Sequence, residues 1–130
     1  MSEKQTVTVD PLTPSIKRVE KPWGYEILWA KTKDYVGKVL FVKKGESLSL
    51  QYHRVKEETL FIETGNCTIE TGKDEKSLEP MHFGPGSVFH ITPGRLHRII
   101  AVTDCRIFEV STPQLDDVVR LQDRYGRQGT

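Results

Sequence analysis

The chain has 130 residues, a formal net charge of +1, and 28% charged and 36% hydrophobic residues. This length is typical of one domain with its own hydrophobic core, which needs neither a disulfide nor a structural metal to fold. The balanced charge argues against a nucleic-acid-binding protein, and the sequence shows neither a membrane-spanning apolar stretch nor a signal-peptide pattern.

The two cysteines, Cys67 and Cys105, stand alone, without a CxxC pair or zinc-finger spacing. Isolated cysteines of this kind are typical of reduced thiols in a cytoplasmic protein, and a disulfide between them is the alternative. We therefore predict a cytoplasmic protein whose partner is a small molecule, with no nucleic acid and no membrane.

Residues 1–15 are polar and contain two prolines, which predicts an arm with little structure of its own. Residues 16–130 are predicted to form a single domain of short apolar runs separated by turn residues. In chain order the runs are "YEILWA", "VGKVLFVKKG", "SLSLQYH", "TLFIETGNCTIETG", "GSVFHITPG", "HRIIAV" and "CRIFEVST". Many short strands between turns predict an all-β fold, an antiparallel sandwich or barrel.

Two local signals refine this prediction. The tetrapeptide from Thr64 to Cys67 contains Gly65 and Asn66, which indicates a hairpin between two strands. The segment "LDDVVRLQDRYG", residues 115–126, carries apolar residues at helical spacing, which predicts a short C-terminal helix.

Polar residues interrupt the apolar runs between residues 45 and 65. Gln51 and His53 stand two positions apart on one strand, so their side chains project in parallel and can reach one cation. A return of the chain would bring Glu58 beside His53, and His97 follows a later strand. Taken singly, each has an ordinary alternative, namely an exposed histidine, a surface amide or a carboxylate in a solvated charge run.

The joint spacing is more specific. Gly45, Gln51, His53, Glu58 and Gly65 are followed by Gly86, Pro93, Gly94 and His97. This pattern resembles the two motifs of the cupin superfamily, with Gln51 in place of the usual first histidine and Ala101 in place of the usual asparagine. The resemblance implies an antiparallel double-stranded β-helix (jelly-roll) barrel.

A closer resemblance covers residues 19–127. The segments "VEKPWGYEILWA", "SLSLQYH", "TPGRLHRI" and "DDVVRLQDRYGR" look like the cupin domain of type II mannose-6-phosphate isomerases, which also occurs fused behind mannose-1-phosphate guanylyltransferases. One departure is that Thr59-Leu60 stands where the family has His-Trp. The sequence has no room for a nucleotidyltransferase domain, so we do not expect guanylyl transfer.

The resemblance implies one divalent metal ion held by Gln51, His53, Glu58 and His97, with zinc, manganese, iron and nickel not distinguished. It also implies an aldose–ketose isomerase, in which the metal stabilises an enediolate while a general base moves a proton between two carbons. Candidates for catalysis are Glu58, Lys56 and Arg98, and His90 is a further candidate for the general base.

The C-terminal arginines are the predicted substrate-binding residues. Guanidinium groups bind phosphate oxygens through paired donors, and Arg98 follows the metal histidine directly. At helical spacing Arg120 and Arg124 would share one face, with Arg127 nearby. The alternative is that Asp116, Asp117 and Asp123 neutralise these arginines in surface ion pairs.

Two other functions remain open at this point. Two histidines and a carboxylate also form the ligand set of non-haem Fe(II) oxygenases. A non-catalytic cupin that binds a sugar or metabolite is the other alternative, because Gln51 is a weaker ligand than histidine. The resemblance further implies a homodimer.

Overall fold

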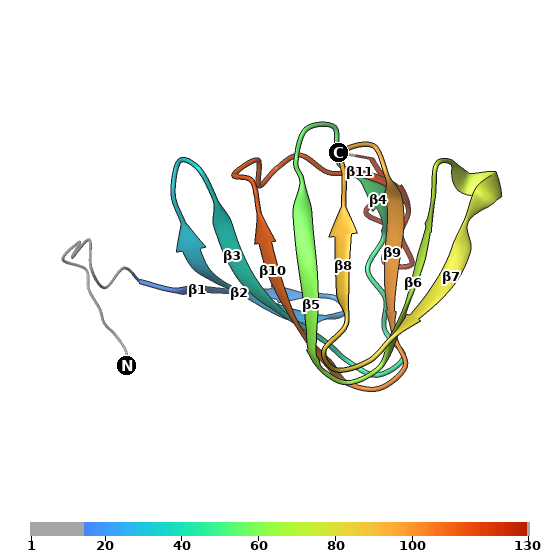
Figure 1. Ribbon diagram of the computed structural model, residues 1–130, viewed down its shortest axis with the longest axis horizontal. Coiled ribbons are helices and arrows are strands. Elements are labelled where there is room, and N and C mark those ends of the chain that lie inside the picture. Colours follow the sequence, from blue (N-terminus) through green and yellow to red (C-terminus); the bar gives the residue numbers. More distant parts are fainter. Residues whose placement is uncertain (1–14, 130) are drawn as a thin grey trace.

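The computed structural model describes residues 15–129, which form two antiparallel β-sheets facing each other around a barrel interior (Figure 1). One sheet has six strands in the order β1 (Lys17–Lys21), β2 (Gly24–Lys31), β3 (Val36–Val42), β10 (Cys105–Ser111), β5 (Glu58–Thr64) and β8 (Val88–Ile91). The other has five in the order β11 (Val119–Gln122), β4 (Leu50–Tyr52), β9 (Leu96–Ala101), β6 (Cys67–Gly72) and β7 (Glu79–Phe83). A 3₁₀ turn, Glu75–Ser77, joins β6 to β7. This architecture is the predicted antiparallel barrel.

Side-chain alternation separates the inside of the barrel from the outside. In β10, Ile107 and Glu109 are buried, whereas Phe108 and Val110 between and beyond them are exposed. The same period of two runs along β3, where Leu40 and Val42 are buried. This pattern is expected of an antiparallel sheet with one face on the core and one face toward solvent.

The apolar core occupies one end of the barrel. Its members are Trp23, Leu40, Val42, Leu60, Ile62, Cys67, Ile69, Ile91, Ile99, Ala101, Cys105 and Ile107. Both cysteines are free thiols in this core, and burial together with the neighbouring Cys105 raises the pKa of Cys67 to about 12. The buried polar residues His53, Glu58 and Glu109 lie toward the other end, where β5 begins and β10 ends.

The hairpin predicted at Thr64–Cys67 is wrong. β5 pairs with β10 and β8, whereas β6 pairs with β7 and β9 in the other sheet. The turn therefore carries the chain from one sheet to the other. Gly65 has a φ of +89°, and a Cβ at this position would lie 2.1 Å from the carbonyl oxygen of Asp104. The glycine is needed for this backbone approach rather than for a hairpin.

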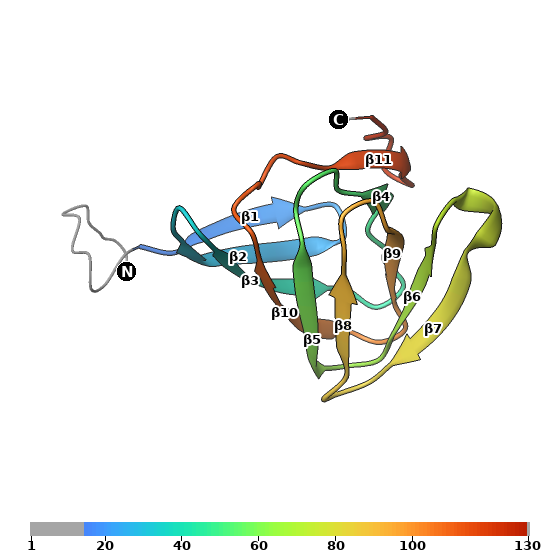
Figure 2. The ribbon, with the colours of Figure 1, turned by 45° about the horizontal axis from the view of Figure 1, so that its top comes forward.

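The C-terminal helix predicted at residues 115–126 is also wrong. Residues Val119–Gln122 form β11, which pairs with β4 so that Arg120 lies opposite Gln51, and Figure 2 shows this strand running across one end of the barrel. β4 pairs with β9 on one side, and β11 pairs with its other edge. The β-branched pair Val118-Val119 also suits a strand better than a helix. The Arg120 amide also exchanges backbone hydrogen bonds of 2.8 Å with Gly129, which closes a turn that a helix would not allow.

The predicted arm, residues 1–15, lies outside the described residues except for its last member. Within the described part of the chain, no helix has the length and apolar character needed to span a membrane.

Candidate metal centre

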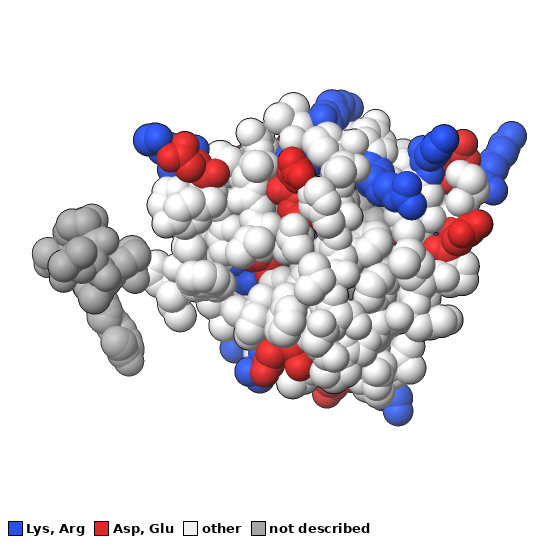
Figure 3. All heavy atoms as spheres, in the orientation of Figure 1, with Lys and Arg blue, Asp and Glu red and all other residues white. Residues whose placement is uncertain are grey.

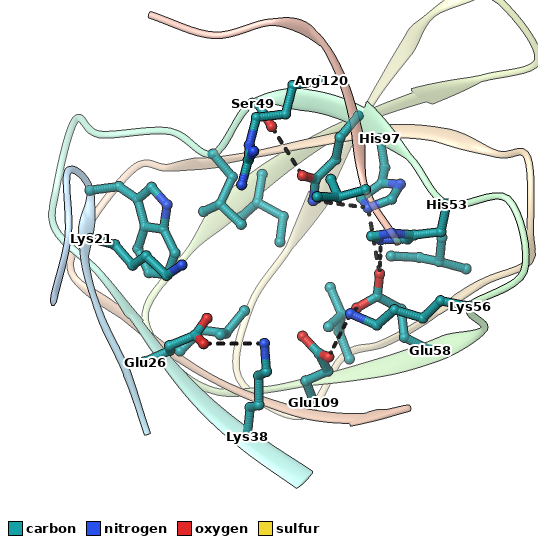
Figure 4. Close-up of a pocket in the computed structure, with 18 of the residues that line it drawn as sticks. Lys21, Glu26, Lys38, Ser49, His53, Lys56, Glu58, His97, Glu109 and Arg120 are labelled. Carbon is teal, nitrogen blue, oxygen red and sulfur yellow. Dashed lines mark hydrogen bonds and ion pairs between the residues drawn. The ribbon is translucent and has the colours of Figure 1, made fainter. Parts of the chain in front are cut away.

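Three buried side chains converge at the polar end of the barrel. His53 follows β4, Glu58 is the first residue of β5, and His97 is the second residue of β9. The Nε2 atom of His53 lies 2.8 Å from Oε2 of Glu58, and Nε2 of His97 lies 3.6 Å from the same oxygen. One ligand atom from each residue lies within 4.8 Å of the other two (Figure 4). The structure thus brings together three of the four predicted metal ligands.

Backbone carbonyls set the protonation of both imidazoles. Nδ1 of His53 donates to the carbonyl oxygen of Asp117, and Nδ1 of His97 donates to that of Arg95 at 3.0 Å. Because a carbonyl oxygen only accepts, each Nδ1 carries a hydrogen, and Nε2 is the ring nitrogen of each histidine that is available to a metal ion. Nε2 of His53 is buried and faces Oε2 of Glu58, with no other hydrogen-bond partner among the described residues.

Glu58 completes this set as an anion. Burial by itself opposes ionisation, but the contact with His53, the charge of Lys56 and the proximity of His97 outweigh it and lower the pKa of Glu58 to about 2. Burial lowers the pKa of His97 and keeps its ring neutral. Two imidazole nitrogens and one carboxylate oxygen that face one point form a donor set for a cation. The residues therefore fit a divalent metal ion, and the carbonyl contacts are the orienting interactions that metal-binding histidines typically make.

Gln51, the fourth predicted ligand, stands beside the triad. β4 and β9 pair so that Gln51 lies opposite His97, and its Nε2 is 3.5 Å from Nε2 of His97. Its Oε1 accepts a 3.0 Å hydrogen bond from the hydroxyl of Ser49. A half-turn of the amide would direct the oxygen toward the triad, and the hydroxyl can donate or accept in either case. Gln51 is thus placed for a weak fourth contact.

Buried charges extend the site beyond the triad. Nζ of Lys56 lies 3.1 Å from Oε2 of Glu109 and 3.8 Å from Oε1 of Glu58. Burial, followed by the charge of Glu58, raises the pKa of Glu109, and the two carboxylates keep that of Lys56 raised despite its own burial. A second ion pair joins Nζ of Lys38 to Oε2 of Glu26 at 3.2 Å.

These groups line a cavity of about 110 Å³ inside the barrel, together with Lys21, Trp23 and several aliphatic side chains. Glu109 and Lys38 are not among the site residues predicted from the sequence, although a signal was present. Each occupies an inward position of a strand whose other inward residues are mostly apolar, Ser111 being the exception. A charge at such a position indicates a buried pair or a site.

The predicted phosphate-binding arginines separate into two groups. Arg120 and Arg127 line the cavity. Arg98 lies on the opposite side of β9 from His97, outside the cavity, where it pairs with Glu70 at 2.6 Å. Alternation along a strand requires this placement, because residues next to an inward side chain point outward.

Arg124 donates to the carbonyl oxygen of Gly45 at 2.8 Å and does not line the cavity, so the helical face expected to join it to Arg120 does not form. Arg127 is neutralised by Asp123, with donor distances of 2.9 and 3.1 Å, as the ion-pair alternative predicted. His90 contacts Glu57 on the exposed outer side and is not part of the cavity lining.

Comparison with known proteins places the chain in a family. The family model described as "Mannose-6-phosphate isomerase C-terminal" matches residues 11–123. A mannose-1-phosphate guanylyltransferase from Salmonella typhimurium is 31% identical over 117 residues, and one from Escherichia coli is 32% identical over the same length. Each match covers 85% of this chain and 23% of the relative, so the chain spans about a quarter of the length of these curated relatives.

Solved structures show the same fold at low sequence identity. KdgF from Halomonas sp. has a TM-score of 0.67 at 17% identity, covering 78% of this chain and 90% of that one. The oxalate decarboxylase of Lactobacillus farciminis in a formate complex has a TM-score of 0.69 at 16% identity, covering 82% of this chain and 33% of that one. Likeness at these identities concerns the fold, the jelly-roll barrel that the sequence predicted. The chain is a cupin, and it belongs to the mannose-6-phosphate isomerase C-terminal family.

Proposed function

We propose that this protein is a metal-dependent aldose–ketose isomerase that acts on a phosphorylated sugar. The observation that carries this proposal is the convergence of two imidazole Nε2 atoms and the Glu58 carboxylate inside a cavity lined by cationic side chains. The family model and the printed names of the curated relatives, which concern mannose phosphates, support a sugar phosphate as the substrate.

A divalent ion at the triad would supply Lewis acidity toward a carbonyl and its neighbouring hydroxyl. The chain's own residues then have to hold and move a proton. Lys56, whose raised pKa keeps it protonated, is the candidate donor, and Glu109, whose pKa burial raises, is the candidate acceptor; Nζ of Lys56 lies between Oε2 of Glu109 and Oε1 of Glu58. The two oxygens of Glu58 have different neighbours: Oε2 faces the imidazoles and Oε1 faces Lys56.

An oxygenase is the second candidate, and one observation favours it. The three residues that converge are two histidines and one carboxylate, which is the ligand set of non-haem Fe(II) oxygenases. A non-catalytic binding role is a further alternative, because Gln51 is the weakest ligand of the four. These alternatives differ in oxygen consumption and in turnover.

The deciding experiment starts from protein purified without chelator. Its metal content is measured, and the conversion of mannose 6-phosphate to fructose 6-phosphate is followed in a coupled assay while dissolved oxygen is recorded. We expect isomerisation that chelation abolishes, with no oxygen uptake, and no turnover by the His97→Ala variant. Oxygen uptake coupled to loss of the sugar would favour the oxygenase, and binding without turnover in the metal-loaded protein would favour the binding role.

A further inference from the structure

Apart from Glu58, whose carboxylate faces the two imidazoles, charge pairing inside the cavity leaves two cations over. Lys38 is matched by Glu26, Lys56 by Glu109, and Arg127 by Asp123. Neither Lys21 nor Arg120 has a carboxylate within ion-pair distance among residues 15–129, although both line the cavity. A cavity with two unmatched cations attracts an anion of complementary size.

Arg120 is held in place by its strand. β11 pairs with β4, and the backbone of Arg120 is further tied to Gly129. Its Nε is buried and has no acceptor among the described residues. A buried guanidinium N–H without an acceptor raises the free energy of the folded state, because it has lost its hydrogen bonds to water. A bound oxyanion would accept a hydrogen bond from it and offset that cost.

Lys21 approaches from the opposite sheet. It is the last residue of β1, and Figure 4 shows its side chain on the far side of the cavity from His53 and Glu58, with the Arg120 side chain extending from β11 into the space between. Burial is the first cause that lowers the pKa of Lys21; the charge of Glu26 opposes it, and the positive charges of Lys38, Arg127 and Arg120 add to it. The cations therefore crowd one another on this wall.

We propose that Arg120 and Lys21 form an oxyanion subsite in the wall of the cavity away from the triad, so that the ligand is a small molecule with two functional ends. Its phosphate or carboxylate meets Arg120 and Lys21, while hydroxyl or carbonyl oxygens at its other end face His53, Glu58 and His97. The inference rests on the proposed function in placing both ends of one substrate in this cavity. It assigns anion recognition to Lys21, which the sequence analysis did not nominate, in place of Arg98 and Arg124.

The test is calorimetric titration of the full chain with mannose 6-phosphate, inorganic phosphate, glucuronate and mannose. We expect the wild-type protein to bind the charged sugars more tightly than mannose, and the better of mannose 6-phosphate and glucuronate identifies the anion as phosphate or carboxylate. Arg120→Met and Lys21→Met should each raise the dissociation constant of that sugar about ten- to a hundredfold, the effect of losing a charge-assisted hydrogen bond. Metal content and melting temperature should stay near wild type.

Arg106→Met is the matched control, because Arg106 is exposed on the outer face of β10, and it should bind the same sugar as the wild type does. Arg120→Lys keeps the charge and should lose less affinity than Arg120→Met, which separates anion binding from damage to β11. Unchanged affinity in both Arg120→Met and Lys21→Met, or equal affinity of the wild type for mannose and the charged sugars, would overturn the subsite.

The subsite and the isomerase can fail separately. Anion binding that depends on Arg120 and Lys21 in a protein with no isomerase activity would refute the proposed reaction and support the subsite. Isomerisation of mannose 6-phosphate with an unchanged Michaelis constant in Arg120→Met and Lys21→Met would support the reaction and refute the subsite.

Discussion

At His53 and His97, a backbone carbonyl binds one ring nitrogen and leaves the other directed at Glu58. The main chain therefore sets the orientation of each ring. A side-chain substitution elsewhere does not remove these carbonyl contacts. Metal affinity should depend on the two rings themselves. His53→Ala and His97→Ala are each expected to reduce bound divalent metal from about one ion per chain to near none, as measured by plasma mass spectrometry. Gln51→Ala should lower occupancy less, because an amide oxygen is the weaker ligand.

His90→Ala is the control for these variants, since His90 is exposed and contacts Glu57 outside the cavity. It should retain the metal. The sheet circular-dichroism spectrum should persist in all of them, because the apolar core at the other end of the barrel does not depend on the metal. Full metal occupancy in His97→Ala would show that the second cupin motif does not supply a ligand.

At the scale of elements, the segment before β11 is fastened to the loop between β4 and β5 by Asp117. Its carboxylate accepts from the backbone amides of Arg54 at 3.0 Å, Val55 at 2.6 Å and Lys56 at 2.9 Å. These bonds, that of Lys56 first, lower the pKa of Asp117 from 3.8 to about 2. A lowered pKa means that the carboxylate stabilises the fold above its ordinary pKa and that this contribution is lost as the pH falls toward 2.

We expect Asp117→Asn to lower the free energy of unfolding by about 1 kcal/mol at pH 7, the scale of a lost capping interaction. The difference from wild type should shrink between pH 4 and pH 2, because the wild-type carboxylate is protonated there as well. Urea unfolding at pH 7 and pH 2.5 measures both values. Asp116→Asn changes a neighbouring exposed carboxylate and should have little effect, and an equal loss in that variant would contradict the role of Asp117.

On the scale of the whole molecule, the outer face of the six-stranded sheet is unusually apolar. Phe61 and Phe108 stack at 6.0 Å between ring centroids, and Val88 and Val110 beside them are more than half exposed. Figure 3 shows this side of the molecule with charged side chains mostly at its margins. These four residues form an apolar patch without charged groups, which a second copy of the same patch can cover. The homodimer expected from the family resemblance stays our prediction.

Light scattering behind size-exclusion chromatography should therefore give twice the chain mass of 14.9 kDa. Phe108→Lys should shift the protein to the monomer while its melting temperature changes little, since the ring is 38% exposed. Val102→Glu, at a more exposed apolar position (52%) in the loop before β10, should leave the dimer intact. A wild-type monomer, or a dimer that survives Phe108→Lys, would contradict this interface.

The sequence by itself determined the barrel and most of the candidate metal site. Strand parity is a local property and put Gln51 and His53 on one face of one strand, and the resemblance to the cupin motifs implied that Glu58 and His97 join them; the structure brings His53, Glu58 and His97 together. The same alternation also excludes Arg98 from the cavity, since a residue next to the inward His97 must point outward.

Only the tertiary structure decided which charges share the cavity. Lys21, Glu26, Lys38 and Glu109 come from β1, β2, β3 and β10, and they meet through pairings between residues far apart in the chain. The C-terminal segment became a strand because β4 presented a free edge and the loop after β4 presented three amides to Asp117. No local pattern encodes such partners, because a backbone edge and a set of unpaired amides exist only once the barrel has closed.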